Sequence, residues 1–182
     1  MNNSCTHEER FFENMLGLTS FIKVLVEKVS DAGHKIVNPM IIDIAMVILN
    51  NYDKNKIIEN FILYSHDYWD QIFMKDERFI HENCLIIFQD LPKNHVEAFT
   101  HIFLLKNKNG EFIIDSDDKD IIWEYFSSFI KISIKYIHEK RVCVEKIVDG
   151  KMIPRWLHDY MKHINLQSEA KRWNVKLTAR NN

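Results

Sequence analysis

Glycine, proline and cysteine are scarce in this sequence, and each scarcity narrows the class of fold. The 182 residues include only four glycines and three prolines. An all-β domain of this length usually needs many more turn residues, so the composition favours long helices. Four isolated glycines cannot build a glycine-rich phosphate loop, which removes the common nucleotide-binding folds. The three cysteines are few and widely spaced, unlike a disulfide framework, and they predict a reducing compartment.

Long apolar runs and leader-like segments are also lacking. The longest apolar stretch, Met40 to Leu49, is interrupted by Asp43 and is too short for a bilayer, which takes ~20 apolar residues. The N-terminal residues lack a basic region followed by an apolar one, as a signal peptide would have. We therefore expect an intracellular protein that is neither secreted nor embedded in a membrane.

The residues that are abundant predict a helical core. Hydrophobic residues make up 46% of the chain and aromatic residues 12%, which is ample material for one domain. Apolar residues recur at helical spacing in several segments. The helices we expect span residues 6–29, 40–51, 54–74, 77–90, 95–105 and 117–140, and a last amphipathic helix is expected to begin at Pro154. Residues 40–51 are apolar almost all round, which predicts a buried helix.

These segments predict a mainly α fold, a single multi-helix domain around a central long helix at 117–140. Two adjacent apolar stripes on that helix indicate contact with several neighbours. A small β-hairpin is expected at 141–153, where Val142, Val144 and Ile147 flank the turn pair Asp149-Gly150. Thr6 with Glu9 predicts a capping box at the start of the first helix.

Charge is unevenly distributed, although the net charge is only −2. From Met161 to Asn182 there are five basic residues and one acidic residue, a net +4. We divide the chain into a helical domain at 1–165 and a basic C-terminal tail at 166–182. From Glu111 to Glu124 there are six acidic residues against Lys119 alone. The sequence therefore has one acidic patch and one basic tail.

Three motifs suggest chemistry, and none is complete. Ser65-His66-Asp67 has the residue types of a hydrolase triad, but neighbouring residues on a helix point about 100° apart and cannot bond in series. His81 and Cys84 share a helix face and are weak candidates for a metal, which would need two further ligands. The loop around Gly110 resembles part of a calcium site, but its first and twelfth positions are not acidic. We expect no catalytic residues, no metal and no cofactor.

Two surfaces are better candidates for contact with a partner. The first is the acidic start of the central helix, where Asp115 or Ser116 caps the helix and the other carboxylates oppose its dipole; the same residues could attract a basic partner or a divalent ion. It comprises Asp115, Asp117, Asp118 and Asp120. The second is the tail, which could be a frayed end, dock on a protein with Trp173 as anchor, or hold nucleic acid. Its residues are Lys171, Arg172, Trp173, Lys176 and Arg180. The other tryptophans are expected in the core.

One stretch of the chain resembles known proteins in four short sequence motifs. The motifs are Trp69-Asp70, Lys75-Asp76-Glu77-Arg78-Phe79, Phe88-Gln89-Asp90-Leu91-Pro92 and Lys131-Ile132-Ser133-Ile134-Lys135-Tyr136-Ile137-His138. From Tyr68 to Arg141 the chain resembles small uncharacterised helical proteins of large nucleocytoplasmic DNA viruses of protists. The resemblance implies an intracellular viral setting, the host cytoplasm or the virion, and carries over no catalytic residue.

Together these observations predict a non-enzymatic helical protein for interaction or structure, such as a virion or virus-factory component. A protein partner or self-association is expected, with the acidic patch of one copy meeting the basic tail of another. The alternative is a nucleic-acid-associated factor that uses the basic tail. A metal-dependent or hydrolytic enzyme is the least favoured of the three.

Overall fold

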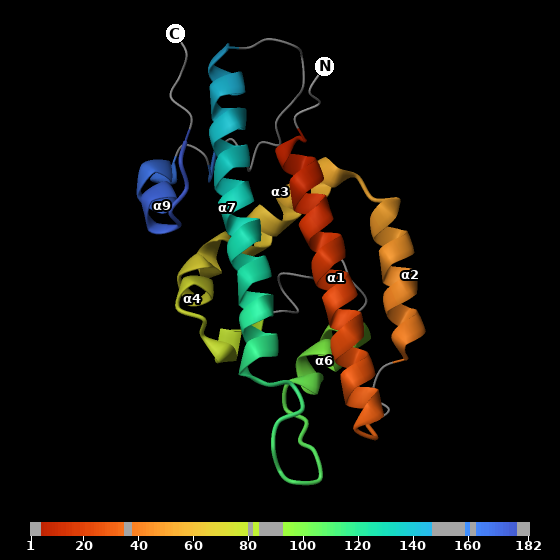
Figure 1. Cartoon of the computed structure of the whole chain (residues 1–182). Helices are drawn as coiled ribbons and strands as arrows, with labels where there is room; N and C mark the ends of the chain where they lie inside the picture. The colour runs from red at the N-terminus through yellow and green to blue at the C-terminus, as the bar shows by residue number, and fades with distance from the viewer. Residues whose placement is uncertain are drawn as a thin grey trace.

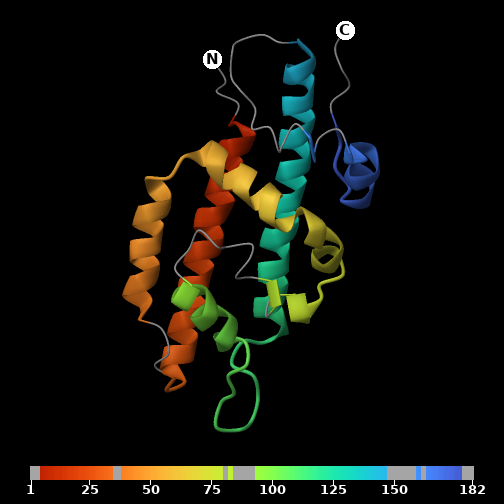
Figure 2. The ribbon, with the colours of Figure 1, turned by 180° about the vertical axis from the view of Figure 1, so that it is seen from behind.

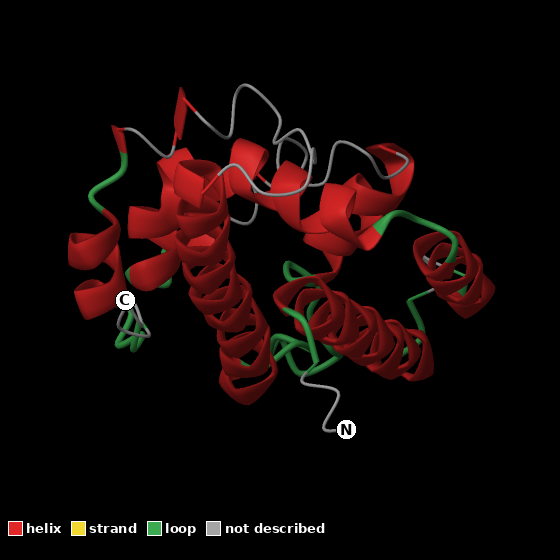
Figure 3. Ribbon diagram, turned by 90° about the horizontal axis from the view of Figure 1, so that it is seen from above, coloured by secondary structure: helices red, strands yellow, loops and turns green. Residues whose placement is uncertain are grey.

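The computed structural model describes residues 5–34, 38–79, 82–83, 93–146, 159–160 and 163–177. Within these residues the fold is mainly helical, and the only β pairing is an isolated antiparallel bridge between Lys106 and Phe112 (Figure 3). The prediction of a multi-helix fold around a long helix is confirmed. The elements are α1 (His7–Asp31), α2 (Pro39–Asn50), α3 (Lys54–Ser65), η1 (His66–Tyr68), α4 (Trp69–Phe73), α6 (Lys93–Ile102), α7 (Ser116–Lys146) and α9 (Leu166–Arg172).

Local signals in the sequence set the starts of the helices. The Thr6 hydroxyl accepts a hydrogen bond from the Glu9 amide, and the Glu9 carboxylate accepts one from the Thr6 amide, so the predicted capping box is confirmed. Asn38 caps α2, which has Pro39 at its first position. Asp53 caps α3 in the same way. These side chains satisfy amides that have no partner inside their helix.

The antiparallel pair of α1 and α7 forms the centre of the molecule (Figure 1). An ion pair fixes each end: Lys140 reaches Glu8 at 3.1 Å, and Lys28 reaches Asp118 at 2.6 Å. Near the middle of α1, Gly17 lets α7 come close, because a Cβ there would lie 2.8 Å from the Tyr125 hydroxyl. The two helices are therefore held by charge at their ends and by close packing between them.

An aromatic cluster joins a third helix to this pair. The rings of Phe11, Phe61 and Phe129 have centroids 4.8 to 5.4 Å apart, and all three are buried. They come from α1, α3 and α7, so α3 crosses the pair on the face seen in Figure 2. Trp69 and Trp123 are buried as well, which confirms their predicted place in the core. Trp156 lies outside the described residues.

Helices α2, α4 and α9 flank the central pair on opposite sides, and α6 lies near its lower end (Figure 1). Helix α2 packs on α1, whereas α4 and α9 pack on α7. The segment after residue 165, expected as a tail, is part of the packed core as far as it is described, because Leu166, Ala170 and Trp173 are buried there. Its helix is short and begins at a cap formed by Asn165.

The predicted hairpin at 141–153 is wrong in its first half, because α7 continues to Lys146. Extending an existing helix adds a backbone hydrogen bond for each residue without a new nucleation step, and this outweighs the strand preference of Val142 and Val144. Residues 147–153, which include the turn pair, lie outside the described residues.

The single helix expected at 54–74 is divided into α3, η1 and α4. At the junction, the His66 imidazole lies 3.0 Å from the carbonyl oxygens of both Ile62 and Leu63. A side chain that bonds these carbonyls competes with the regular helical pattern and favours a tighter turn. The break allows α4 to leave the direction of α3 and pack along α7.

Candidate functional site

The acidic start of α7 is organised as a helix cap. The Asp115 carboxylate accepts hydrogen bonds from the amides of Asp117 and Asp118, both at 3.0 Å. Asp118 returns the interaction by accepting from the Asp115 amide at 3.1 Å. Of the two caps that the sequence left open, the structure selects Asp115, since α7 begins at Ser116.

Basic residues within the chain already balance most of this patch. Lys28 from α1 donates to Asp115 at 2.9 Å and to Asp118 at 2.6 Å. The hydrogen bonds to Asp118 and Asp115 raise the pKa of Lys28, and the bond from Lys28 lowers the pKa of Asp115. Lys75 forms an ion pair with Asp120. Among the described residues, only Asp117 of the four predicted carboxylates has no ion pair.

The predicted tail residues are divided between the interior and the surface. Trp173 is only 4% exposed and packs edge-on against Phe73, with ring centroids 5.2 Å apart. Arg172 forms an ion pair with Asp70. Lys171 and Lys176 are exposed, and Arg180 lies outside the described residues. Trp173 therefore anchors the chain to itself, and two lysines remain on the surface.

The residues considered for catalysis do not form a site. Ser65 is fully buried, and its hydroxyl accepts a hydrogen bond from the Trp69 indole at 3.1 Å. His66 Nδ1 bonds the helix carbonyls instead of Ser65, and His66 Nε2 lies 3.2 Å from the Asp67 carboxylate, so histidine and aspartate meet without the serine. His81 and Cys84, the weak metal candidates, fall outside the described residues. In the part of the chain that the structure describes, no three His, Cys, Asp or Glu side chains are grouped as metal ligands would be.

The surface that the sequence analysis missed is the outer face of α2. This helix was expected to be buried, but four of its apolar side chains are more than half exposed. They are Met40 (63%), Ile44 (53%), Val47 (62%) and Ile48 (51%). An apolar pattern on every side of a helix shows that one side packs, but it does not show how many neighbours the helix has. Here α1 covers one side and leaves the other in solvent.

The only charged residue of α2 is committed to the contact with α1. The Asp43 carboxylate accepts a hydrogen bond from Lys23 at 2.7 Å. Ser20 of α1 also donates to the Met46 sulfur at 3.8 Å, on the same inner side. The outer face is therefore apolar and carries no free charge. No helix in the described part of the chain is both long enough and apolar enough to cross a bilayer.

Comparison with known proteins identified no relative of this chain. No family model matches the chain, and neither the curated proteins nor the solved structures contain a match. The viral resemblance of Tyr68 to Arg141 therefore stays a prediction, and function has to be argued from the residues themselves.

Proposed function

We propose that this chain is a non-enzymatic helical interaction protein that associates with a second copy of itself through the outer face of α2. The observation that supports the proposal is the set of exposed side chains Met40, Ile44, Val47 and Ile48 on one short helix. A contiguous apolar patch on a folded surface commonly marks a contact site. The charged surfaces expected from the sequence support contact less well, because their charges are largely paired within the chain.

The spacing of the exposed residues suits packing against another helix. Met40, Ile44, Val47 and Asn51 follow each other at steps of four, three and four residues. At about 100° per residue, such positions fall within a narrow arc on one side of a helix. Ile48 lies beside this stripe and widens it. Two such helices can interlock their side chains over about three turns.

The lack of free charge on the outer face of α2 favours a second copy of the same chain as the partner. The outer face carries no free charge that would select an oppositely charged partner, since Asp43 is held by Lys23. An apolar stripe of this kind complements itself when two copies meet about a twofold axis. The net charge of −2 adds little repulsion between copies.

The size of the patch predicts a weak dimer. Burying an aliphatic side chain completely contributes roughly 1.5–3 kcal/mol, so each half-exposed side chain contributes roughly 1 kcal/mol. Four from each copy give on the order of 8 kcal/mol, against an association cost of about 4–15 kcal/mol. The surplus is at most about 4 kcal/mol, so we expect a dissociation constant of roughly 1 mM, and the dimer forms where local concentration is high, as in an assembly.

The proposal also includes the place where the protein works. The few, widely spaced cysteines and the viral resemblance support an intracellular viral protein that works in the host cytoplasm or the virion. A nucleic-acid role for the tail has less support, because Arg172 is paired, Trp173 is buried, and Lys171 and Lys176 provide few phosphate contacts.

Sedimentation equilibrium of the purified full-length chain between 5 and 500 μM tests the proposal. The mean mass should rise from that of a monomer towards that of a dimer. Ile44→Lys should keep the protein monomeric, because it places a charge at the centre of the stripe in a residue type that favours helices. Met74→Lys is the matched control, since Met74 is 74% exposed but follows α4 on the other side of the molecule. A monomer at every concentration, or equal effects of both variants, would reject the proposal.

A further inference from the structure

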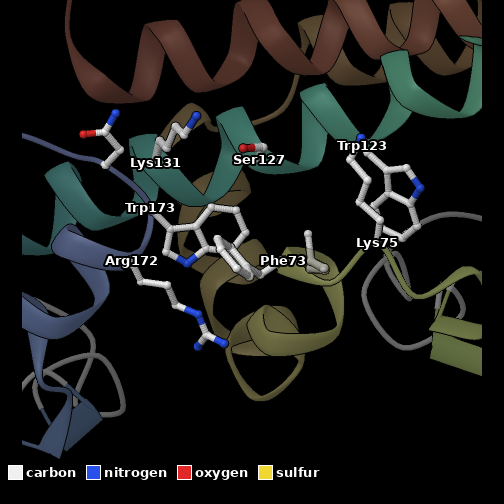
Figure 4. Close-up of a pocket in the computed structure, with 9 residues that line it drawn as sticks. Phe73, Lys75, Trp123, Ser127, Lys131, Arg172 and Trp173 are labelled. Carbon is white, nitrogen blue, oxygen red and sulfur yellow. The ribbon is translucent and has the colours of Figure 1, made fainter.

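A second surface feature lies on the opposite side of the molecule from α2 and is independent of the proposed function. It is a pocket of about 260 Å³ between α7, α4 and the end of α9 (Figure 4). Its apolar walls include Trp123 and Trp173, which are both 4% exposed, and Phe73, which is 45% exposed. A pocket of this size can hold a small organic molecule, and its aromatic walls suit a flat apolar body.

The polar lining of the pocket is cationic. Three basic side chains, Lys75, Lys131 and Arg172, contribute to it, and no acidic residue does. Arg172 is held from outside by the ion pair with Asp70, and its guanidinium carbon lies 5.0 Å from the centre of the Phe73 ring.

The ion pairs around the pocket leave one positive charge for a ligand. Asp70 balances Arg172, and Asp120 balances Lys75. Lys131 forms no ion pair with any residue that the structure describes. Among the described residues, the pocket therefore carries one uncompensated positive charge, which favours an anionic ligand over a neutral one.

The Trp173 side chain is a wall of the pocket. Its indole nitrogen is buried at the edge of the ring that faces Arg172, and it is turned away from Lys131 (Figure 4). Trp173 therefore offers a ligand the apolar face of its ring, and Lys131 offers the charge.

We propose that this pocket binds a small organic monocarboxylate with an aromatic or similarly flat body. The body lies against Phe73, Trp123 and Trp173, and the carboxylate lies near Lys131. Lys75 and Arg172 border the site, each held in place by its own carboxylate partner.

The test is a titration of the full-length ¹⁵N-labelled protein with benzoate, followed through the indole N–H signal of Trp173. Benzoate packed against the Trp173 ring should shift this signal to a plateau. Benzamide has the same size without the charge and should not reach a plateau over the same range.

Two lysines of α7 provide matched variants. Lys131→Gln should weaken benzoate binding by about twofold to fivefold, the effect of one exposed charge pair. Lys135→Gln, one turn further along the same helix and outside the pocket lining, should leave binding unchanged. The proposal is overturned if benzoate gives no saturable shift, if both variants behave alike, or if benzamide binds as tightly as benzoate. None of these outcomes depends on whether α2 mediates dimerisation.

Discussion

Replacing Gly17 with alanine sets two opposing effects against each other at the contact of α1 with α7. Alanine is favoured over glycine inside a helix by about 1 kcal/mol. The added Cβ, however, would lie 2.8 Å from the Tyr125 hydroxyl oxygen and 3.1 Å from its Cε1 carbon. Overpacking of this kind costs about 1–3 kcal/mol. We expect the steric cost to be larger, so that Gly17→Ala lowers the free energy of unfolding by about 1 kcal/mol.

A double-mutant cycle tests whether the Tyr125 ring causes the steric cost of Gly17→Ala. In a Tyr125→Ala background the obstructing ring is absent, so Gly17→Ala should raise the free energy of unfolding by about 1 kcal/mol. The difference between backgrounds, about 2 kcal/mol, lies within the range for residues in contact. Urea denaturation followed by tryptophan fluorescence gives all four values. If Gly17→Ala had the same sign and size in both backgrounds, close packing at this point would not be the reason for glycine.

Three further predictions concern polar contacts of the core. Lys28→Met should lower the free energy of unfolding by about 1 kcal/mol in urea denaturation at low salt, and by less at high salt, because it removes the ion pairs to Asp115 and Asp118. Tyr136→Phe should cost about 1–2 kcal/mol, since the buried Tyr136 hydroxyl donates to Glu59 at 2.7 Å; an unchanged urea midpoint would contradict this. Burial lowers the pKa of His7 below its ordinary 6.5, so the unfolded chain binds this proton more readily and stability should fall as the pH drops below about 6.5. His7→Gln should reduce that fall in thermal melts from pH 7.5 to 5, and an unaltered pH profile would refute it.

Local features of this fold could be predicted from sequence, whereas contacts between distant segments could not. The capping box of Thr6 and Glu9 involves residues three apart, so the sequence alone predicts it. The division of the expected helix at 54–74 depends on His66 turning back to carbonyls of the preceding turn, and composition gives no sign of this. The continuation of α7 through Val142 depends on a helix already formed before it.

The same limit applies to the candidate surfaces, because their contacts also join distant segments of the chain. The acidic run was identified correctly as a helix start, but its pairing with Lys28 joins residues about ninety positions apart and could not be read from spacing. Docking on a partner through Trp173 was one of three alternatives left open for the basic tail, and in the structure Trp173 packs against Phe73. Helix α2 was expected to be buried because apolar residues surround it. Only the structure shows that one neighbour covers one side.

The most direct test of the central claim is a dilution series of the ¹⁵N-labelled wild-type chain, which shows which residues enter a contact as concentration rises. We predict that amide signals between 20 and 500 μM change together at Met40, Ile44, Val47 and Ile48, and that those of the acidic start of α7 and of α9 stay fixed. Changes confined to residues 115–120 and 171–176 would instead support association by charge. No change anywhere would contradict self-association through α2.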